Sequence, residues 1–394
     1  MRVLVTGATG YIGSAAAGAL LNRGHQVFGL ARSGRSATTL RDQGVEPLMG
    51  DFGDPGSLGA AVAAADPHVV VSAASLGASA GDNPVSFARD RDAVRAIQAA
   101  LSRPDQALVF TSGSAVFGVF NGGEATATVY DEESRLPLPV STFAPSSAGV
   151  YPLLVAGFGQ AMAARVETER IVLGHLGSRG IVIRPGLVYG RGGRYDIPAI
   201  IARGRGRGRA GHFGSGATTH SYIHLDDLAE LYCLAVESAP PGATLHGVVG
   251  DITQRELAEA VNRMLGAGEQ TDSLTLVQML GMNAAERFAL TATRHLTLNL
   301  SRKIGSLFSP PSSVGAGISL SLDKRISAEK TRRLLGWTPT RTDILQDIES
   351  GSYAINDRRQ LNAHRRRGPV SELRAPQPQT RSDPASHHIF ERAK

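Results

Sequence analysis

Three glycines with a regular spacing mark the part of the sequence that could do chemistry. Gly7, Gly10 and Gly13 lie in TGATGYIG, directly after the apolar run VLV and before an alanine-rich stretch. Glycine at such positions allows a tight turn and lets a backbone approach a phosphate closely. The N–H groups and the positive dipole at the start of the following helix then face the anion. The pattern therefore predicts a turn that holds the pyrophosphate of a dinucleotide.

The spacing resembles that of the short-chain dehydrogenase/reductase superfamily, in its extended branch of NAD(P)-dependent epimerases, dehydratases and reductases. GDF at 50–52 resembles the element that meets the adenine, and SAAS at 72–75 resembles the stretch along the pyrophosphate and ribose. The resemblance implies a set of cofactor-binding residues, the last of them beside the nicotinamide: Gly7, Thr9, Gly10, Tyr11, Ile12, Gly13, Asp51, Phe52, Ala73, Ala74 and Pro185.

The residues after the second apolar run indicate which dinucleotide the turn would hold. An acidic side chain at the end of HQVFGL would accept hydrogen bonds from the ribose 2′-hydroxyl of NAD. The sequence instead continues with Ala31, Arg32 and Ser33, and Arg35 follows. A guanidinium there can pair with a 2′-phosphate. We therefore expect Arg32 and Ser33 to bind the cofactor, and NADP to be preferred to NAD. The alternative is that Arg32 is an ordinary solvated arginine.

The proton-transfer residues of the superfamily are replaced in this sequence. The resemblance implies a serine or threonine that orients the substrate oxygen, and a tyrosine followed four residues later by a lysine that lowers its pKa. Aligned on LVFTSGSAVFG and ARVETERIVL, these positions hold Gly113, Ala161 and Arg165. No other register restores the pair, because no lysine precedes Lys303. Arg165 is expected to bind the nicotinamide ribose but not to transfer protons, since arginine stays protonated.

Three hydroxyls remain as catalytic candidates: Ser112, Ser114 and Tyr151. The serines flank Gly113, and Tyr151 lies at the end of a long loop rich in Gly, Pro and Ser. A loop of this length is more often functional than a simple connection. Tyr151 with either serine would form a substitute hydroxyl pair near the nicotinamide. The alternative is a loop tyrosine that packs on the core.

A histidine and an aspartate in YIHLDDLA are a further acid–base candidate. His224 and Asp226 lie where a strand is expected to enter a helix, in a segment that joins the substrate region to the core in the resembled superfamily. We expect hydrogen bonding and helix capping from them. A metal site is not expected, because no helix contains His-x-x-x-His or His-Glu-x-x-His and the acids at 131–133 suggest a solvated run.

Basic residues are concentrated in RGRGRGR at 203–209 and in the C-terminal HRRRG, and the net charge is +6. The first stretch has no aromatic side chains to stack on bases, so nucleic-acid binding is disfavoured. A surface loop explains it better, and the charge favours small anions or solubility. The resembled sugar-nucleotide enzymes have an arginine just before YIH. Its absence here argues against a sugar-nucleotide substrate.

Continuous apolar runs alternate with alanine-rich stretches from RVLVTG to GIVIRPGLVYG. Such runs predict strands that helices bury on both faces. The expected fold is α/β, a doubly wound parallel Rossmann sheet with a smaller, mostly helical substrate-binding part. We assign 1–190 and 220–250 to the Rossmann core, 191–219 and 251–354 to the substrate-binding part, and 355–394 to a poorly ordered tail.

Composition limits the class of protein further. The 394 residues are 42% apolar and 19% charged, which allows a large buried core. The sequence has neither a run of about 18 apolar residues nor a signal-peptide pattern, so we expect a cytoplasmic protein without membrane association. Cys233, the single cysteine, excludes an internal disulfide and reads as a small buried helix residue. A homodimer is left open.

These observations lead to three hypotheses. The first is an NADP-dependent oxidoreductase, epimerase or dehydratase of the extended type that acts on a small carbonyl, alcohol or secondary metabolite. The second is a non-redox elimination, isomerisation or cyclisation in the cofactor cleft. The third is a non-catalytic protein that senses NADP. The enzymatic hypotheses take a small-molecule substrate, and none of the three involves nucleic acid.

Overall fold

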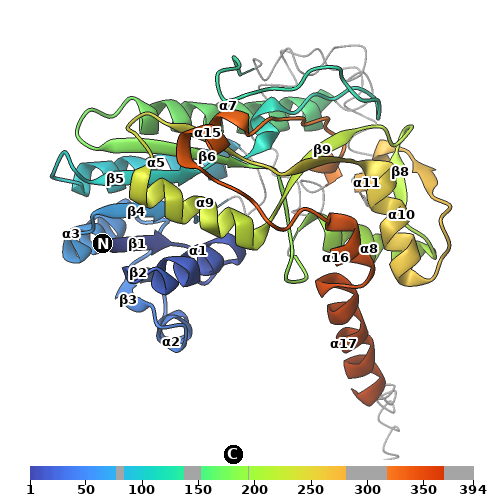
Figure 1. Cartoon of the computed structure of the whole chain (residues 1–394), viewed down its shortest axis with the longest axis horizontal. Helices are drawn as coiled ribbons and strands as arrows, with labels where there is room; N and C mark the ends of the chain where they lie inside the picture. Colours follow the sequence, from blue (N-terminus) through green and yellow to red (C-terminus); the bar gives the residue numbers. More distant parts are fainter. Residues whose placement is uncertain (77–83, 137–151, 194, 281–316, 368–394) are drawn as a thin grey trace, which may run out of the picture. The chain divides into compact units, whose positions relative to one another are not determined.

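Seven parallel strands form the central sheet of the computed structural model (Figure 1). The structure describes residues 1–76, 84–136, 152–193, 195–280 and 317–367. Within these the strand order is β10-β6-β5-β4-β1-β2-β3, and it changes direction between β1 and β4. The strands are β1 (Arg2–Thr6), β2 (Gln26–Ala31), β3 (Glu46–Met49), β4 (Val69–Ser72), β5 (Ala107–Thr111), β6 (Arg179–Pro185) and β10 (Thr244–Gly247).

Helices cover both faces of this sheet, which explains its apolar strands. Val3, Leu4 and Val5 of β1 are all fully buried although successive side chains point to opposite faces. Val3 and Val5 share an apolar cluster with α1 (Tyr11–Asn22), α2 (Gly34–Asp42) and α9 (Leu225–Ser238). Leu4 packs with α3 (Pro55–Ala65) and α5 (Pro84–Ala100), and α7 (Pro152–Leu173) lies against α5.

Helices α1 and α9 lie side by side and run in the same direction (Figure 1). Arg23 at the end of α1 forms an ion pair with Glu237 near the end of α9 at 2.5 Å. Both helices therefore begin at the carboxyl edge of the sheet, where the glycine turn also lies. The chain that enters each helix is brought to the same edge by β1 and by β9 (Thr219–His224).

Smaller elements follow the core. β7 (Leu187–Tyr189), β9 (Thr219–His224) and β11 (Gly250–Thr253) form one sheet, and β8 (Gly211–Phe213) pairs with β12 (Asp272–Leu274). The remaining helices are η1 (Ser114–Phe117), α8 (Asp196–Arg207), α10 (Gln254–Leu265), α11 (Leu276–Leu280), α15 (Glu329–Leu335), α16 (Ile344–Glu349) and α17 (Ser352–Arg367). The chain divides into two compact units, Met1–Asn356 and Asp357–Lys394. Helix α17 begins in the first unit and extends into the second.

Several element boundaries agree with the sequence because their signals are local. Thr253 and Glu256 form a reciprocal capping box at the start of α10, as the threonine predicts. Gly336 ends α15 in the left-handed conformation. Cys233 is fully buried in α9, and burial raises the pKa of its thiol to about 12.

Other boundaries differ from the expectation. The stretch RGRGRGR is not a loop, because it forms the end of helix α8 and the residues directly after it. Arg203 in this stretch donates to the carbonyl of Met279 at 2.9 Å. The run GIVIRPGLVYG contains two strands in different sheets, because Gly186 lies tightly against the carbonyl of Ser221. α17 continues to Arg367, where the sequence predicted a poorly ordered tail from 355. The sequence also indicates a mostly helical stretch at 274–308, of which residues 281–308 lie outside the described residues.

Candidate active site

The glycine turn between β1 and α1 has no room for side chains. Gly7 has a φ of +72°, and a Cβ on it would lie 2.9 Å from the backbone nitrogen of Ala74. A Cβ on Gly13 would overlap the carbonyl oxygen of Gly7, and one on Gly10 would lie 3.0 Å from that oxygen. All three positions therefore favour glycine strongly, and the bare backbone can approach a ligand closely.

The first turn of α1 keeps its backbone donors free of side-chain caps. Gly10 is the N-cap residue and no side chain bonds to the N–H groups of Tyr11, Ile12 or Gly13 as a cap. Thr9 is exposed beside them. The turn lies between β1 and β4, where the strand order changes direction, and sheets of this type bind nucleotides there. These residues fit a pyrophosphate at the helix N-terminus.

The end of β2 presents two cationic side chains. Arg32 and Arg35 are exposed, and neither guanidinium has a polar partner within the described ranges. Ser33 is the N-cap of α2, and its hydroxyl accepts the N–H of Ser36 at 3.2 Å. The hydroxyl expected to meet the cofactor therefore already stabilises a helix, whereas both arginines are available to an anion.

The remaining cofactor positions follow other strands at the same edge. The carboxylate of Asp51 is exposed after β3 and accepts the N–H of Gly53 at 2.8 Å, and Phe52 is buried. After β4, Ala73 and Ala74 contact Gly7, and the N–H of Ala74 donates to Thr6 Oγ1 at 3.3 Å. The ends of three strands are thus brought to one edge. The assignment of these residues to adenine and ribose stays a prediction.

The catalytic candidates lie at the end of β5. Ser112 is 5% exposed, and its Oγ has no hydrogen-bond partner in the part of the chain that the structure describes. Ser114 is also 5% exposed and begins η1. Gly113 between them is extended, and a Cβ there would meet only the carbonyl of Pro185, at 4.0 Å. The third candidate, Tyr151, lies outside the described residues.

Arg165 holds the backbone at the end of β5. Its guanidinium donates to the carbonyl oxygens of Thr111 at 3.1 Å and Ser112 at 3.0 Å. It also lies over the ring of Phe87, with its central carbon 4.8 Å from the ring centre. Ala161, one turn earlier on α7, is fully buried in the core. The arginine therefore positions the segment that contains Ser112.

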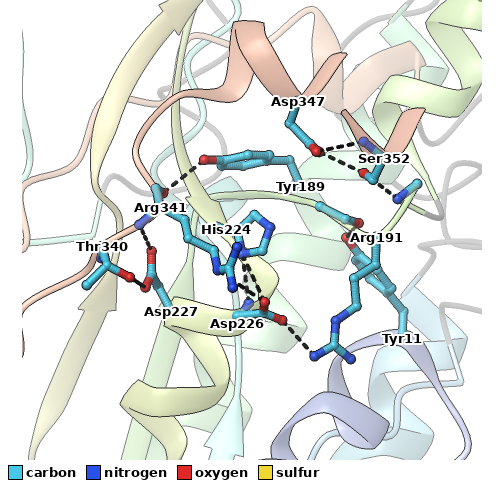
Figure 2. A network of polar contacts seen from close by, with 12 residues as sticks. Tyr11, Tyr189, Arg191, His224, Asp226, Asp227, Thr340, Arg341, Asp347 and Ser352 are labelled. Carbon is cyan, nitrogen blue, oxygen red and sulfur yellow. Dashed lines mark hydrogen bonds and ion pairs between the residues drawn. The ribbon is translucent and has the colours of Figure 1, made fainter. Parts of the chain in front are cut away.

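A polar network lies at the start of α9, next to α1 (Figure 2). His224 is the N-cap residue, and its Nδ1 accepts the N–H of Asp226 at 3.1 Å. Burial lowers the pKa of His224, against the opposing charge of Asp226. The Asp226 carboxylate forms ion pairs with Arg191 at 2.7 Å and Arg341 at 3.2 Å. The capping role expected of the histidine is confirmed.

The C-terminal segment 337–356 packs on this network. Asp227 accepts hydrogen bonds from the N–H groups of Thr340 at 3.0 Å and Arg341 at 2.8 Å. The phenol of Tyr189 donates to the carbonyl of Arg341 at 2.9 Å. A cavity of about 400 Å³ lies between Tyr189, His224 and residues 340–351. Among the described residues, none of the expected cofactor residues and neither Ser112 nor Ser114 lines it.

Comparison with known proteins gives the family. Residues 3–151 match the sequence model of the NAD dependent epimerase/dehydratase family. A 3-diazoavenalumate denitrifying reductase of a Streptomyces species is 31% identical over 248 residues, which are 61% of this chain and 74% of that protein. The chain belongs to this family. Membership places it among the NAD(P)-binding oxidoreductases, epimerases and dehydratases.

Two further proteins extend the comparison beyond the residues that the family match covers. A 2-alkyl-3-oxoalkanoate reductase of Stenotrophomonas maltophilia is 28% identical, over 68% of this chain and 76% of that protein. A dTDP-glucose 4,6-dehydratase of Streptomyces venezuelae, solved with NAD bound, is 19% identical with a TM-score of 0.62, over 92% of this chain and 98% of that one. The structural likeness confirms the doubly wound Rossmann fold.

Two structural features of this epimerase/dehydratase family member were not predicted from its sequence. Glu132 is buried and accepts the N–H of Thr331 at 2.8 Å, so it is not part of a solvated run, whereas Asp131 and Glu133 are exposed as expected. In addition, Asp323 and Ile326 form isolated β-bridges with Val119 and Tyr130, respectively. The docking of segment 337–356 was also missed, because its hydrogen bonds to Tyr189 and Asp227 leave no pattern in the sequence.

The described residues contain no group of three or more His, Cys, Asp or Glu side chains placed to hold a metal ion. No helix among them is long and apolar enough to cross a bilayer.

Proposed function

We propose that this chain is an NADP-dependent reductase that acts on a small carbonyl compound. The observation that carries the proposal is the pair of exposed guanidinium groups of Arg32 and Arg35 after β2, next to the bare glycine turn, which have no polar partner among the described residues. The family fold brings the ribose of the cofactor to the end of that strand, and a 2′-phosphate there needs a cation. An acidic side chain, which would favour NAD, is absent from residues 31–36.

The reductase assignment draws on named relatives. The Stenotrophomonas maltophilia and Streptomyces proteins are both named as reductases, one of an oxoalkanoate and one of a diazo compound. NADPH supplies a hydride when bound. In this chain the substrate carbon would lie above Gly113, where the absence of a side chain leaves space beside Pro185.

The chain's own residues would then orient the substrate oxygen. The unpaired Oγ of Ser112 is the first candidate donor, and Ser114 is the second. Arg165 fixes the backbone that places Ser112. The proton would come from Tyr151, from a substrate group or from water, since neither Ala161 nor Arg165 can act as an acid near neutral pH.

Binding measurements test the cofactor assignment first. We expect the wild-type chain to bind NADPH at least tenfold more tightly than NADH by titration calorimetry. Arg32→Ala should remove most of that preference, because the 2′-phosphate loses its charge partner. Arg41→Ala, an exposed arginine at the other end of α2, is the matched control and should leave both affinities unchanged. Equal binding of both dinucleotides by the wild-type chain would contradict the assignment.

Turnover is tested separately. Loss of NADPH absorbance over a panel of small ketones, oxoacids and diazo compounds would identify a reductase substrate. Ser112→Ala should then lower kcat more than it changes KM.

A second candidate function follows from the residues at the expected catalytic positions. Gly113, Ala161 and the engaged Arg165 offer no acid or base there. The chain would then hold NADP for a non-redox reaction or as a sensor. Tight NADPH binding with no absorbance change over the whole panel would favour this candidate.

A further inference from the structure

The loop after β7 is a left-handed turn that contains an arginine. Gly190, Arg191, Gly192 and Gly193 have φ values of +105°, +50°, +81° and +59°. The N–H of Gly193 donates to the carbonyl of Gly190 at 2.9 Å and closes the turn. Residues with a side chain avoid this conformation, and in the described chain only Arg191 and Asp66 adopt it without being glycine. A fourth glycine would fit the turn better than arginine does.

The visible partner of Arg191 does not account for this choice. Its guanidinium forms an ion pair with Asp226 at 2.7 Å, but the side chain is 59% exposed. Ion pairs this exposed contribute little to stability. Asp226 also has Arg341 at 3.2 Å, so its carboxylate would keep a cationic partner if Arg191 turned away. A strained residue without a structural reason is a candidate for a role in binding.

The place of the loop indicates which ligand that role concerns. The phenol of Tyr11, the first residue of α1, donates to the carbonyl of Gly190 at 2.6 Å. Figure 2 shows the side chain of Arg191 running alongside that of Tyr11 toward α1. Its charge acts on Tyr11, although burial dominates and raises the pKa of that phenol. Arg191 therefore lies beside the uncapped first turn that faces the pyrophosphate.

We propose that Arg191 is a ligand of the cofactor pyrophosphate, approaching it from the side opposite the N–H groups of α1. This inference rests on the proposed function, because it needs a dinucleotide in the glycine turn. A guanidinium suits the task, since its planar donors can bind two phosphate oxygens at once. Arg341 holds Asp226 while Arg191 turns to the anion. The turn positions a cation where the helix alone provides only dipoles.

Two variants of Arg191 test the proposal through binding. Arg191→Gly relieves the left-handed strain, so the melting temperature without ligand should stay equal to that of the wild type or rise. Its dissociation constant for NADPH should rise at least tenfold. Arg191→Lys should recover part of the loss, because it keeps the charge but not the planar fork. Adenosine 2′-monophosphate, which lacks the pyrophosphate, should bind to all three proteins equally.

Arg341→Gln removes the other arginine on Asp226, so Arg191 would have to leave that carboxylate without a cationic partner when it binds the anion. It should lower the NADPH affinity by less than Arg191→Gly does. An unchanged NADPH affinity in Arg191→Gly would overturn the proposal, and so would an equal loss in Arg341→Gln, which would point to the Asp226 network. Failure of the wild-type chain to bind NADPH or NADH would instead refute the proposed function, and this inference with it.

Discussion

The phenol of Tyr11 donates a hydrogen bond of 2.6 Å to the carbonyl of Gly190, across 179 residues of sequence. Tyr353 binds the same glycine from the C-terminal side, where its hydroxyl accepts the Gly190 N–H at 3.3 Å. The N–H of Gly192 donates to Ser352 Oγ at 2.7 Å. One short loop therefore connects the glycine turn to the C-terminal segment.

Removal of the Tyr11 hydroxyl should weaken this connection. Tyr11→Phe removes one of two donors to the Gly190 carbonyl, the other being the N–H of Gly193, and we expect a loss of about 1 kcal/mol in the free energy of unfolding. NADPH should also bind several-fold more weakly, because the loop beside the first turn of α1 loosens. Tyr222→Phe removes a similar hydrogen bond, to the carbonyl of Thr342, which does not involve residues 190–193. It should cost similar stability in urea titrations and leave NADPH affinity unchanged; parallel losses of affinity would refute the coupling.

The close packing at Gly13 predicts a contrast within one helix. Gly13→Ala places a Cβ onto the carbonyl of Gly7, and we expect a loss of about 2 kcal/mol or more together with nucleotide binding. At Gly18 in the same helix, a Cβ meets nothing within 4 Å. Gly18→Ala should stabilise the protein by about 0.5–1 kcal/mol through helix propensity. Thermal melts of both variants check the pair. If Gly13→Ala changed neither the melting temperature nor nucleotide binding, the turn would be able to open around the added methyl group.

Gly113 and Gly118 provide a second contrast, near the catalytic candidates. A serine at 113 has extended backbone and open space, so Gly113→Ser should change the free energy of unfolding by no more than about 0.5 kcal/mol. A Cβ at Gly118 would lie 2.7 Å from Leu322, and Gly118→Ser should cost about 1–3 kcal/mol. If a reductase substrate is found, the new hydroxyl at 113 should alter kcat. Destabilisation at 113 would mean that the space is filled.

Arg165→Lys should lower stability although it restores the superfamily's lysine. A lysine has no planar guanidinium that can lie over Phe87 while its Nη2 donates to the carbonyls of Thr111 and Ser112. We expect a loss of about 1–3 kcal/mol in chemical denaturation. Arg170→Lys, an exposed arginine further along α7, is the control and should have little effect. Equal stability of the Arg165→Lys and wild-type proteins would argue that the guanidinium is free to bind the ribose.

Acid should destabilise the protein through His246. Burial lowers the pKa of this histidine to about 4 from an ordinary 6.5, so between these pH values the unfolded state binds a proton that the folded state does not. Stability should fall as the pH drops through this window, by about 1.4 kcal/mol per pH unit for one proton.

The variant His246→Gln isolates that contribution. The buried residues His212 and His220 titrate in both proteins, so the difference between the two pH profiles reports His246 alone. Urea titrations at several pH values between 4 and 7 should give a shallower pH dependence for the variant. Identical profiles would show that the pKa of His246 is the same in the folded and unfolded states.

Much of the fold follows from the sequence, because its signals are short-range. The alternation of apolar runs and alanine-rich helices needs only the rule that parallel strands are buried on both faces. The capping residues Thr253 and His224 and the terminating Gly336 act within a few residues of where they stand. RGRGRGR is a counterexample. Its composition suggested a loop, but Ile197, Ile200 and Ile201 bury the other face of the same helix.

For the site, the sequence by itself determined the glycine turn. The close contacts of Gly10 and Gly13 are with backbone atoms of the same short segment, so the spacing of the glycines predicts the shape of the turn. The contact of Gly7 with Ala74, by contrast, comes from the tertiary structure. The sequence also determined that no lysine could complete the superfamily's tyrosine–lysine pair. Only the tertiary structure decided what the neighbouring side chains do. Arg165 donates to the carbonyls at the end of β5, the buried Glu132 accepts the N–H of Thr331, and the side chain of Arg191 lies beside that of Tyr11. These contacts join segments from far apart in the chain, and packing chooses such partners without leaving a periodicity to read.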